Sequence, residues 1–317
     1  MLALKQEARA TVRWDDFFID VPGDFRCESG DALSDPHVRV RVFGDLRRPV
    51  VVVAGGISSG RCLDEWWSDQ VAEGAAIDLT RYCAIGFDFS PTEDRRVRLS
   101  PLDQARLVAI ALDSLGVEHV FAWVGASYGA MVGLAFAAEA PARLERLCAI
   151  STAHKPAALA RGWRGVQRRM VEFAIAQGVG EEGLSLARQL AMITYRSADE
   201  FDARFPGGVG ADGRSELDRY LVSRGDAYVS AMAPQRWLSL SESIDRFDVD
   251  PARVRASVTL AACPTDQIAP IESIQELSRR LPNLRGLHEL PSLYGHDAFL
   301  KEPAQVAAII TSCLEGA

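Results

Sequence analysis

The sequence predicts an α/β fold, with a mostly parallel sheet, helices on both of its faces and an inserted helical lid. Three observations lead to this prediction. Short β-branched or apolar runs alternate with stretches of helical period, as in βαβ units. Strand-like runs are missing between about residues 156 and 250, and they return at residue 257. With 317 residues, the chain is long enough for one large domain with an insertion.

Seven short runs have the composition of strands. Residues 37–44 alternate polar with apolar side chains, which is typical of a half-exposed edge strand. The later runs are nearly continuous apolar stretches, so we expect them to be covered on both faces. These six runs span residues 49–56, 82–89, 119–125, 146–152, 257–264 and 284–291.

Stretches of helical period fill the gaps between the runs. Residues 100–116 are predicted to form a helix that Ser100 caps and Gly116 ends, and residues 128–144 a second helix. Four amphipathic helices are expected in the insertion, at residues 161–177, 181–197, 215–232 and 235–247. We therefore expect an α/β core of residues 1–155 and 251–317, and a helical lid of residues 156–250.

The composition narrows the classes of partner. A formal net charge of −8 argues against nucleic acid or an anionic membrane surface. No apolar stretch reaches the length of a membrane span, and the first 16 residues lack the apolar core of a signal peptide. The six cysteines are scattered without a Cys-x-x-Cys pair, which is typical of buried thiols in a reducing cytoplasm. No His-Glu-x-x-His motif or Cys/His cluster suggests a metal site.

Residues 125–129, Gly-Ala-Ser-Tyr-Gly, match the G-x-S-x-G pattern of a nucleophilic serine. A predicted strand ends at Gly125 and a predicted helix begins at Tyr128, which is the strand–turn–helix setting that the motif needs. The small neighbours leave room for a strained backbone that would expose Ser127. The free N–H groups of the helix start would face a developing oxyanion. A plain tight turn is the competing interpretation.

A nucleophilic serine needs a base and an orienting acid. His296 lies in the loop after the last predicted strand, at the carboxyl edge of the sheet where sites of such folds form, and His154 is a weaker candidate. Asp266 directly follows the strand at 257–264, whereas Glu272 lies in the next helix and is expected to be a surface carboxylate. Ser127, Asp266 and His296 thus occur in the chain order that the motif requires.

The oxyanion should be stabilised by two backbone N–H groups from different loops. One is the N–H of Tyr128, directly after the serine. The other is predicted at Ile57, in the glycine-rich loop after the strand at 49–56.

Several longer segments resemble the MetX family of homoserine O-acyltransferases. The resemblance extends from about residue 49 to residue 310 and is strongest in the lid and the C-terminal motifs. It is carried by GASYGAM (125–131), LARQLAMITYRS (186–197), residues 220–249, PTDQIAPIESIQELSRRLPN (264–283) and YGHDAFL (294–300).

This resemblance implies an α/β-hydrolase fold and the transfer of an acyl group from acyl-CoA to L-homoserine, in methionine synthesis. It implies the triad Ser127, Asp266 and His296, and a homodimer formed through the lid. It also implies that Arg188, Tyr195 and Asp297 hold homoserine. Arg188 and Tyr195 are two turns apart on one helix face. A guanidinium suits the amino-acid carboxylate, and the Asp297 carboxylate suits the ammonium group.

The chain departs from the family pattern around the acyl pocket. Ala126, Tyr128 and Ala130 differ from the usual Gly-Gly-Ser-Met-Gly-Gly-Met, and the loop after the first buried strand reads AGGISSGR. FDFSPTEDRR, at 87–96, replaces a family segment rich in Gly and Thr. Acetyl-CoA is narrowly favoured as donor; a succinyl carboxylate would need a cation, for which Arg61 is a candidate.

Other functions remain open at this stage. The same triad would serve a serine hydrolase, or esterase, that uses water as the acceptor. L-serine or another amino alcohol is an alternative acceptor. A catalytically inactive binding module is a third interpretation, against which the complete triad argues.

Overall fold

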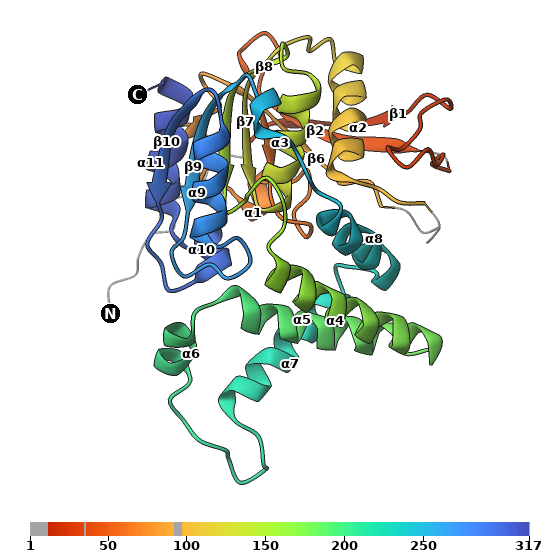
Figure 1. Cartoon of the computed structure of the whole chain (residues 1–317), viewed down its shortest axis with the longest axis vertical. Coiled ribbons are helices and arrows are strands. Elements are labelled where there is room, and N and C mark those ends of the chain that lie inside the picture. Colours follow the sequence, from red (N-terminus) through yellow and green to blue (C-terminus); the bar gives the residue numbers. More distant parts are fainter. Residues whose placement is uncertain (1–11, 35, 92–96, 317) are drawn as a thin grey trace.

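The computed structural model describes residues 12–34, 36–91 and 97–316, and its centre is an eight-stranded sheet (Figure 1). The strand order is β1-β2-β6-β3-β7-β8-β9-β10, and every pair from β6 to β10 is parallel. The strands are β1 (Trp14–Asp20), β2 (His37–Phe43), β3 (Val50–Ala54), β6 (Cys83–Phe87), β7 (Val120–Ala126), β8 (Leu144–Ile150), β9 (Ser257–Ala262) and β10 (Leu284–Glu289). All seven predicted strands are present. Strands β4 (Val71–Ala72) and β5 (Ile77–Asp78) form a separate pair.

The two edges of the sheet differ from the prediction. β1 pairs antiparallel along the whole of β2, so residues 37–44 do not form an edge strand. β1 itself is mostly exposed, and its run of acidic and aromatic residues lacks the alternation that would have revealed it. At the opposite edge, β10 is only partly buried, although its composition suggested a strand covered on both faces.

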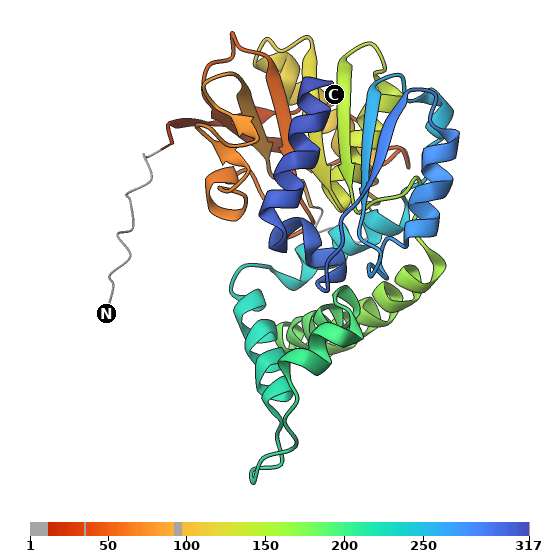
Figure 2. The same ribbon diagram turned by 90° about the vertical axis from the view of Figure 1, so that its left-hand side faces the viewer.

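Helices cover both faces of the sheet (Figure 2). α2 (Pro101–Ser114), α3 (Tyr128–Glu139) and α9 (Ile271–Arg280) pack on one face. α1 (Leu63–Trp66) and α11 (Pro303–Glu315) pack on the other face, and the short α10 (Ala298–Lys301) precedes α11. Ser100 caps α2 in a capping box, as predicted. α3 ends at Glu139 rather than at 144, because Pro141 disfavours helical backbone before it and Leu144 already begins β8.

A helical insert follows β8 and precedes β9 in the chain. It lies beyond the end of the sheet where β8 ends (Figures 1 and 2). It consists of α4 (Ala158–Ala176), α5 (Gly180–Tyr195), α6 (Ala198–Arg204), α7 (Glu216–Val229) and α8 (Pro234–Asp245). The four predicted helices are present, and α6 was not foreseen. The division of the chain at residues 155/156 and 250/251 stays a prediction.

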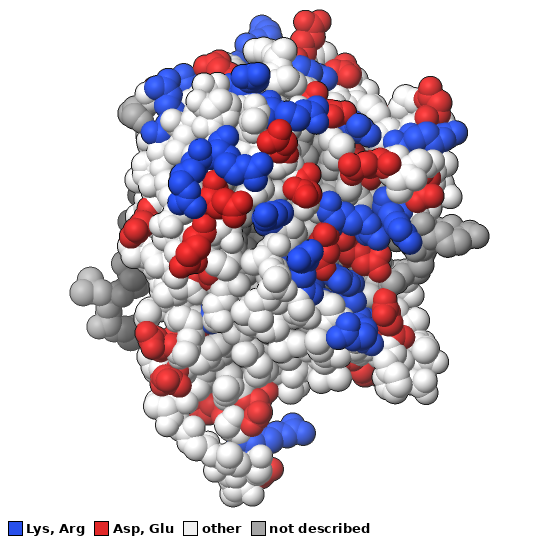
Figure 3. All heavy atoms as spheres, viewed as in Figure 1, with Lys and Arg blue, Asp and Glu red and all other residues white. Residues whose placement is uncertain are grey.

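The charges on the face shown in Figure 3 alternate in sign. Acidic and basic side chains intermingle over the α/β core, which is not the broad basic surface typical of nucleic-acid binding. Within the described ranges, no helix combines the length and apolar character needed to cross a bilayer.

Candidate active site

Three side chains that follow different strands form a continuous chain of hydrogen bonds. Ser127 Oγ lies 2.8 Å from His296 Nε2, and His296 Nδ1 lies 2.7 Å from Asp266 Oδ2. The other oxygen of Asp266 accepts hydrogen bonds from the backbone N–H groups of Ile268 (2.8 Å) and Ala269 (3.0 Å). The structure therefore brings together the serine, histidine and aspartate that the sequence singled out, with the geometry of a nucleophile, its base and an orienting acid.

Ser127 has the strained backbone that a nucleophile at a strand–turn–helix junction needs. Its φ of +52° lies in the left-handed region, which costs a non-glycine residue about 1–3 kcal/mol. The surrounding structure holds this conformation: its N–H donates to the carbonyl of Ile150, and its carbonyl accepts from Ala130 and Met131 in the first turn of α3. Glycine is required at 125, because a Cβ there would approach Ala130 Cα to 2.6 Å.

The surroundings of His296 favour its protonated form. Burial acts to lower the pKa of His296, but the charge of Asp266, its hydrogen bond and the charge of Asp297 outweigh it, so that the pKa is raised above its ordinary value. A base with a raised pKa accepts the serine proton more readily. His154, the weaker candidate, does not line the cavity at Ser127; it is buried and hydrogen-bonded at Nε2 by Arg280 at 2.9 Å.

The backbone N–H groups of Tyr128 and Ile57 suit an oxyanion hole. Tyr128 is the first residue of α3, and Ile57 lies in the loop after β3 beside the cavity. Within the described part of the chain, neither N–H has a hydrogen-bond acceptor. The Tyr128 side chain does not enter the cavity: it is fully buried, its ring packs edge-on against Phe89, and its hydroxyl shares a 2.6 Å hydrogen bond with Ser243 of α8.

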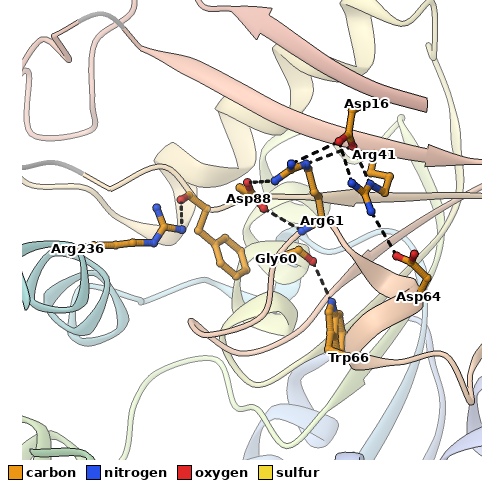
Figure 4. Close-up of polar contacts among 9 residues, drawn as sticks. Asp16, Arg41, Gly60, Arg61, Asp64, Trp66, Asp88 and Arg236 are labelled. Atoms are coloured by element: carbon orange, nitrogen blue, oxygen red, sulfur yellow. Dashed lines mark hydrogen bonds and ion pairs between the residues drawn. The ribbon is translucent and has the colours of Figure 1, made fainter. Parts of the chain in front are cut away.

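An ion-pair network holds the loop that carries Ile57 (Figure 4). Asp88, just after β6, accepts from the Arg61 backbone N–H at 2.9 Å and from Arg61 Nη1 at 2.7 Å. Asp16 of β1 lies 3.3 Å from Arg61 Nε and 2.7 Å from Arg41 Nε of β2. The Arg41 hydrogen bonds are the main reason why the pKa of Asp16 is lowered to about 2.

A tryptophan side chain also holds the loop that carries Ile57. Trp66 of α1 donates from its indole N–H to the Gly60 carbonyl at 2.9 Å (Figure 4). Arg61, which the sequence suggested as a cation for a succinyl carboxylate, pairs with Asp88 and Asp16 and is not among the residues that line the cavity. Residues 92–96 of the segment FDFSPTEDRR lie outside the described residues.

The three residues proposed for homoserine line the same cavity as Ser127 and His296. The Arg188 guanidinium lies over the rings of Tyr195 (5.7 Å) and Tyr228 (4.7 Å). Among the described residues no carboxylate pairs with it. Asp297 Oδ2 lies 3.3 Å from Arg196 Nε, and the Tyr195 ring centroid lies 5.4 Å from that of His296. The cavity is thus lined by a cation, Arg188, and an anion, Asp297, together with His296.

Sequence reasoning missed several cavity residues, among them Ser151 and Arg164. Ser151 directly follows β8, and this position after a central strand was a usable signal. Arg164 is one of four arginines in α4, and the pattern does not show which of them faces inward. In the described ranges, no group of three or more His, Cys, Asp or Glu side chains could hold a metal ion.

Known proteins resemble this chain along most of its length. A family described as alpha/beta hydrolase fold matches residues 48–303. Homoserine O-succinyltransferase of Xanthomonas campestris is 37% identical over 290 residues, covering 88% of this chain and 79% of the relative. Homoserine O-acetyltransferase of Mycobacterium bovis is 29% identical over 350 aligned positions, covering 93% and 92%. The crystal structure of esterase E22 has a TM-score of 0.85 at 16% identity, covering 95% of this chain and 100% of that one, and at this identity it shows the fold alone.

Proposed function

Because the chain belongs to the MetX-type homoserine O-acyltransferases of the α/β-hydrolase fold, we propose that it transfers an acyl group from acyl-CoA to the side-chain hydroxyl of L-homoserine, in methionine biosynthesis. One observation carries this proposal. The Ser127–His296–Asp266 chain of hydrogen bonds opens into a cavity that also holds a cation, Arg188, and an anion, Asp297. These are the two charges that a zwitterionic amino acid needs.

The first half of the reaction would acylate the enzyme. His296 Nε2 takes the proton of Ser127 Oγ while this oxygen attacks the thioester carbonyl. The N–H groups of Ile57 and Tyr128 stabilise the oxyanion. When the tetrahedral intermediate collapses, the carbon–sulfur bond breaks and His296 returns the proton to the sulfur, so that CoA leaves as its thiol. Asp266 holds the imidazole with Nδ1–H toward the carboxylate.

The second half would transfer the acyl group to homoserine. Arg188 binds the carboxylate and Asp297 the ammonium, with Tyr195 beside them, so that the hydroxyl lies next to the acyl ester. His296 removes the hydroxyl proton, the oxygen attacks the ester, and Ser127 leaves with the proton. Water competes for the same ester, so helices α4–α8 would act as a lid that limits its access.

An assay of CoA release tests the proposal. We expect thiol release from acetyl-CoA or succinyl-CoA to depend on L-homoserine, and mass spectrometry to identify the O-acylhomoserine. Release at the same rate without homoserine would instead identify an esterase-like hydrolase, the fold neighbour's activity. L-serine in place of homoserine tests the alternative acceptor. Failure of a fluorophosphonate to label Ser127, together with no CoA release, would identify a binding module.

We also propose that the protein forms a homodimer through its helical insert. α4 exposes Leu159, Val166 and Phe173, and α5 with its N-cap exposes Val179, Leu186 and Ile193. Each set is spaced by seven residues, so each forms an apolar stripe along its helix. Exposed apolar stripes of this kind are typical of an interface between helices.

Oligomeric state tests the dimer proposal. Phe173 is 71% exposed, so Phe173→Asp costs the monomer little packing. In sedimentation experiments we expect twice the 34.5 kDa chain mass for the wild type and a single chain for the variant. A monomeric wild type would contradict the proposal.

We expect the enzyme to act in the cytoplasm, where its six free thiols remain reduced.

A further inference from the structure

Several polar side chains in the cavity wall have no part in the reaction described above, and two of these are a buried serine and a buried arginine. They are the hydroxyl of Ser151, after β8, and the guanidinium of Arg164, in α4. Acetyl transfer would use neither of them, because an acetyl group ends in a methyl. Their presence bears on the identity of the acyl group.

Ser151 is placed where a group on Ser127 would meet it. Ala126 and Ile150 are paired in the register of β7 and β8, so Ser127 and Ser151 are the next residues on the two strands. Ser151 is 1% exposed, and its Oγ has no hydrogen-bond partner among the described residues. Like Ser127 it has a φ of +52°. Burying a hydroxyl without a partner is unfavourable, so a ligand that bonds to it gains accordingly.

Arg164 brings a buried positive charge to the same cavity. It is 9% exposed, and burial, the largest influence, lowers its pKa despite the nearby Asp245. Its charge also acts on His296, opposing the raised pKa of that base, so it lies within electrostatic reach of the catalytic centre. Asp245 is shared, since Arg164 Nη2 and Arg168 Nη2 both lie 2.7 Å from its carboxylate. One carboxylate therefore faces two guanidinium groups.

We propose that Arg164 and Ser151 bind the distal carboxylate of a dicarboxylic acyl group, so that the preferred donor is succinyl-CoA. The inference rests on the proposed function and names its donor. It reverses the narrow preference for acetyl-CoA drawn from the sequence, which looked for a cation near the oxyanion loop, at Arg61, and not in α4.

The charges in the cavity are consistent with two anionic groups in the filled site. Arg188 is taken by the homoserine carboxylate, and Asp297 by the ammonium. A succinyl group on Ser127 adds one more carboxylate, separated from the ester carbonyl by two methylenes. The Arg164 guanidinium provides the charge for it, and the Ser151 hydroxyl provides a neutral hydrogen-bond donor. A charged hydrogen bond in a buried site contributes more than a neutral one.

The experiment compares kcat/KM for succinyl-CoA and acetyl-CoA at saturating L-homoserine. We expect the wild type to favour succinyl-CoA. Arg164→Met should lower the succinyl/acetyl ratio on the order of 100-fold, and Ser151→Ala on the order of tenfold, as expected for a charged and a neutral hydrogen bond. Arg164→Lys should recover part of the ratio. Arg169→Met, an exposed arginine of the same helix outside the cavity lining, is the matched control and should leave the ratio unchanged.

The outcomes separate the possibilities. A wild type that prefers acetyl-CoA overturns this inference and leaves homoserine acylation standing, whereas no acylation of homoserine by either donor overturns the proposed function. A rise in the KM for homoserine with both donors in Arg164→Met would assign Arg164 to the amino acid and contradict the inference. If Arg164→Met does not fold, as judged by circular dichroism, the wild-type ratio and Ser151→Ala decide.

Discussion

Ser127 and Ser151 stand side by side at the ends of adjacent parallel strands, and both hold a φ of +52°. Two left-handed serines in neighbouring positions are a costly arrangement for a backbone. Both serines line the same cavity, where their hydroxyls are placed to act on one group. In the proposed mechanism an acyl chain attached to Ser127 would lie next to Ser151, so the pair would link the nucleophile to the choice of donor.

Replacement of Ser127 tests the covalent step. We expect Ser127→Ala to lower kcat on the order of 10⁴-fold, because the oxyanion donors and the binding residues remain but the acyl-enzyme cannot form. Incubating the wild type with donor alone should add the mass of one acyl group to the peptide that contains Ser127. Full activity in Ser127→Ala, or an acyl group on another residue, would refute the mechanism.

The strand ends could be predicted because the central strands are continuous apolar runs that give way to glycine or polar residues within a few positions. That pattern placed Ser127 and Asp266, and the loop after the last strand placed His296. The pattern is equally clear at Ser151, but a serine without a family motif drew no attention. β1 was missed because its antiparallel pairing with β2, rather than its own composition, holds it as a strand. Arg164 could not be distinguished from Arg161, Arg168 and Arg169, because orientation within the insert depends on packing against α5 and α8.

The raised pKa of His296 predicts the pH dependence of acylation. Only neutral His296 can accept the serine proton, so the rate of CoA release in the first turnover should rise with pH through a pKa above the ordinary value of 6.5. Asp297→Asn removes a charge that raises this pKa and should shift the curve to lower pH. Measuring the first half-reaction, without homoserine, keeps the role of Asp297 in amino-acid binding out of the result.

The control for the pH experiment is Asp248→Asn, an exposed aspartate whose charge acts on His154. It should leave the curve in place. A shift of the Asp297→Asn curve toward higher pH would show that Asp297 does not act on the base through its charge.

The ion pairs around Arg61 predict an effect on kcat that involves no contact with substrate. When the Arg61 side chain is removed, the loop that carries Ile57 loses the 2.7 Å hydrogen bond to Asp88 and the contact with Asp16. We expect Arg61→Met to lower kcat about tenfold or more, less than the loss of a whole oxyanion donor, with little change in the KM for homoserine. Asp88→Asn should act in the same direction. The double variant should lose less activity than the two single effects on free energy add up to, because both substitutions remove the same Arg61–Asp88 interaction.

A general loss of charge near the surface could mimic that result. Arg47→Met provides the comparison, because Arg47 is exposed and pairs with Asp45 away from the cavity. It should leave kcat unchanged. Arg61→Met would contradict the positioning role if it raised the KM for homoserine while kcat stayed constant.

The hydroxyl of Tyr128 predicts an effect on stability that is separate from catalysis. It is buried and shares a 2.6 Å hydrogen bond with Ser243, so it joins α3 of the core to α8 of the insert. Tyr128→Phe leaves the Ser243 hydroxyl buried without this partner and should lower the free energy of unfolding by about 1–2 kcal/mol. The backbone N–H of residue 128 is retained, so kcat should change less than threefold, which corresponds to a small change in the activation free energy.

Ser243→Ala together with Tyr128→Phe should recover part of the lost stability, because no hydroxyl is then left unpaired. Denaturant unfolding of the three variants measures this, and a loss of kcat on the order of 100-fold in Tyr128→Phe would instead assign the phenol a role in the reaction.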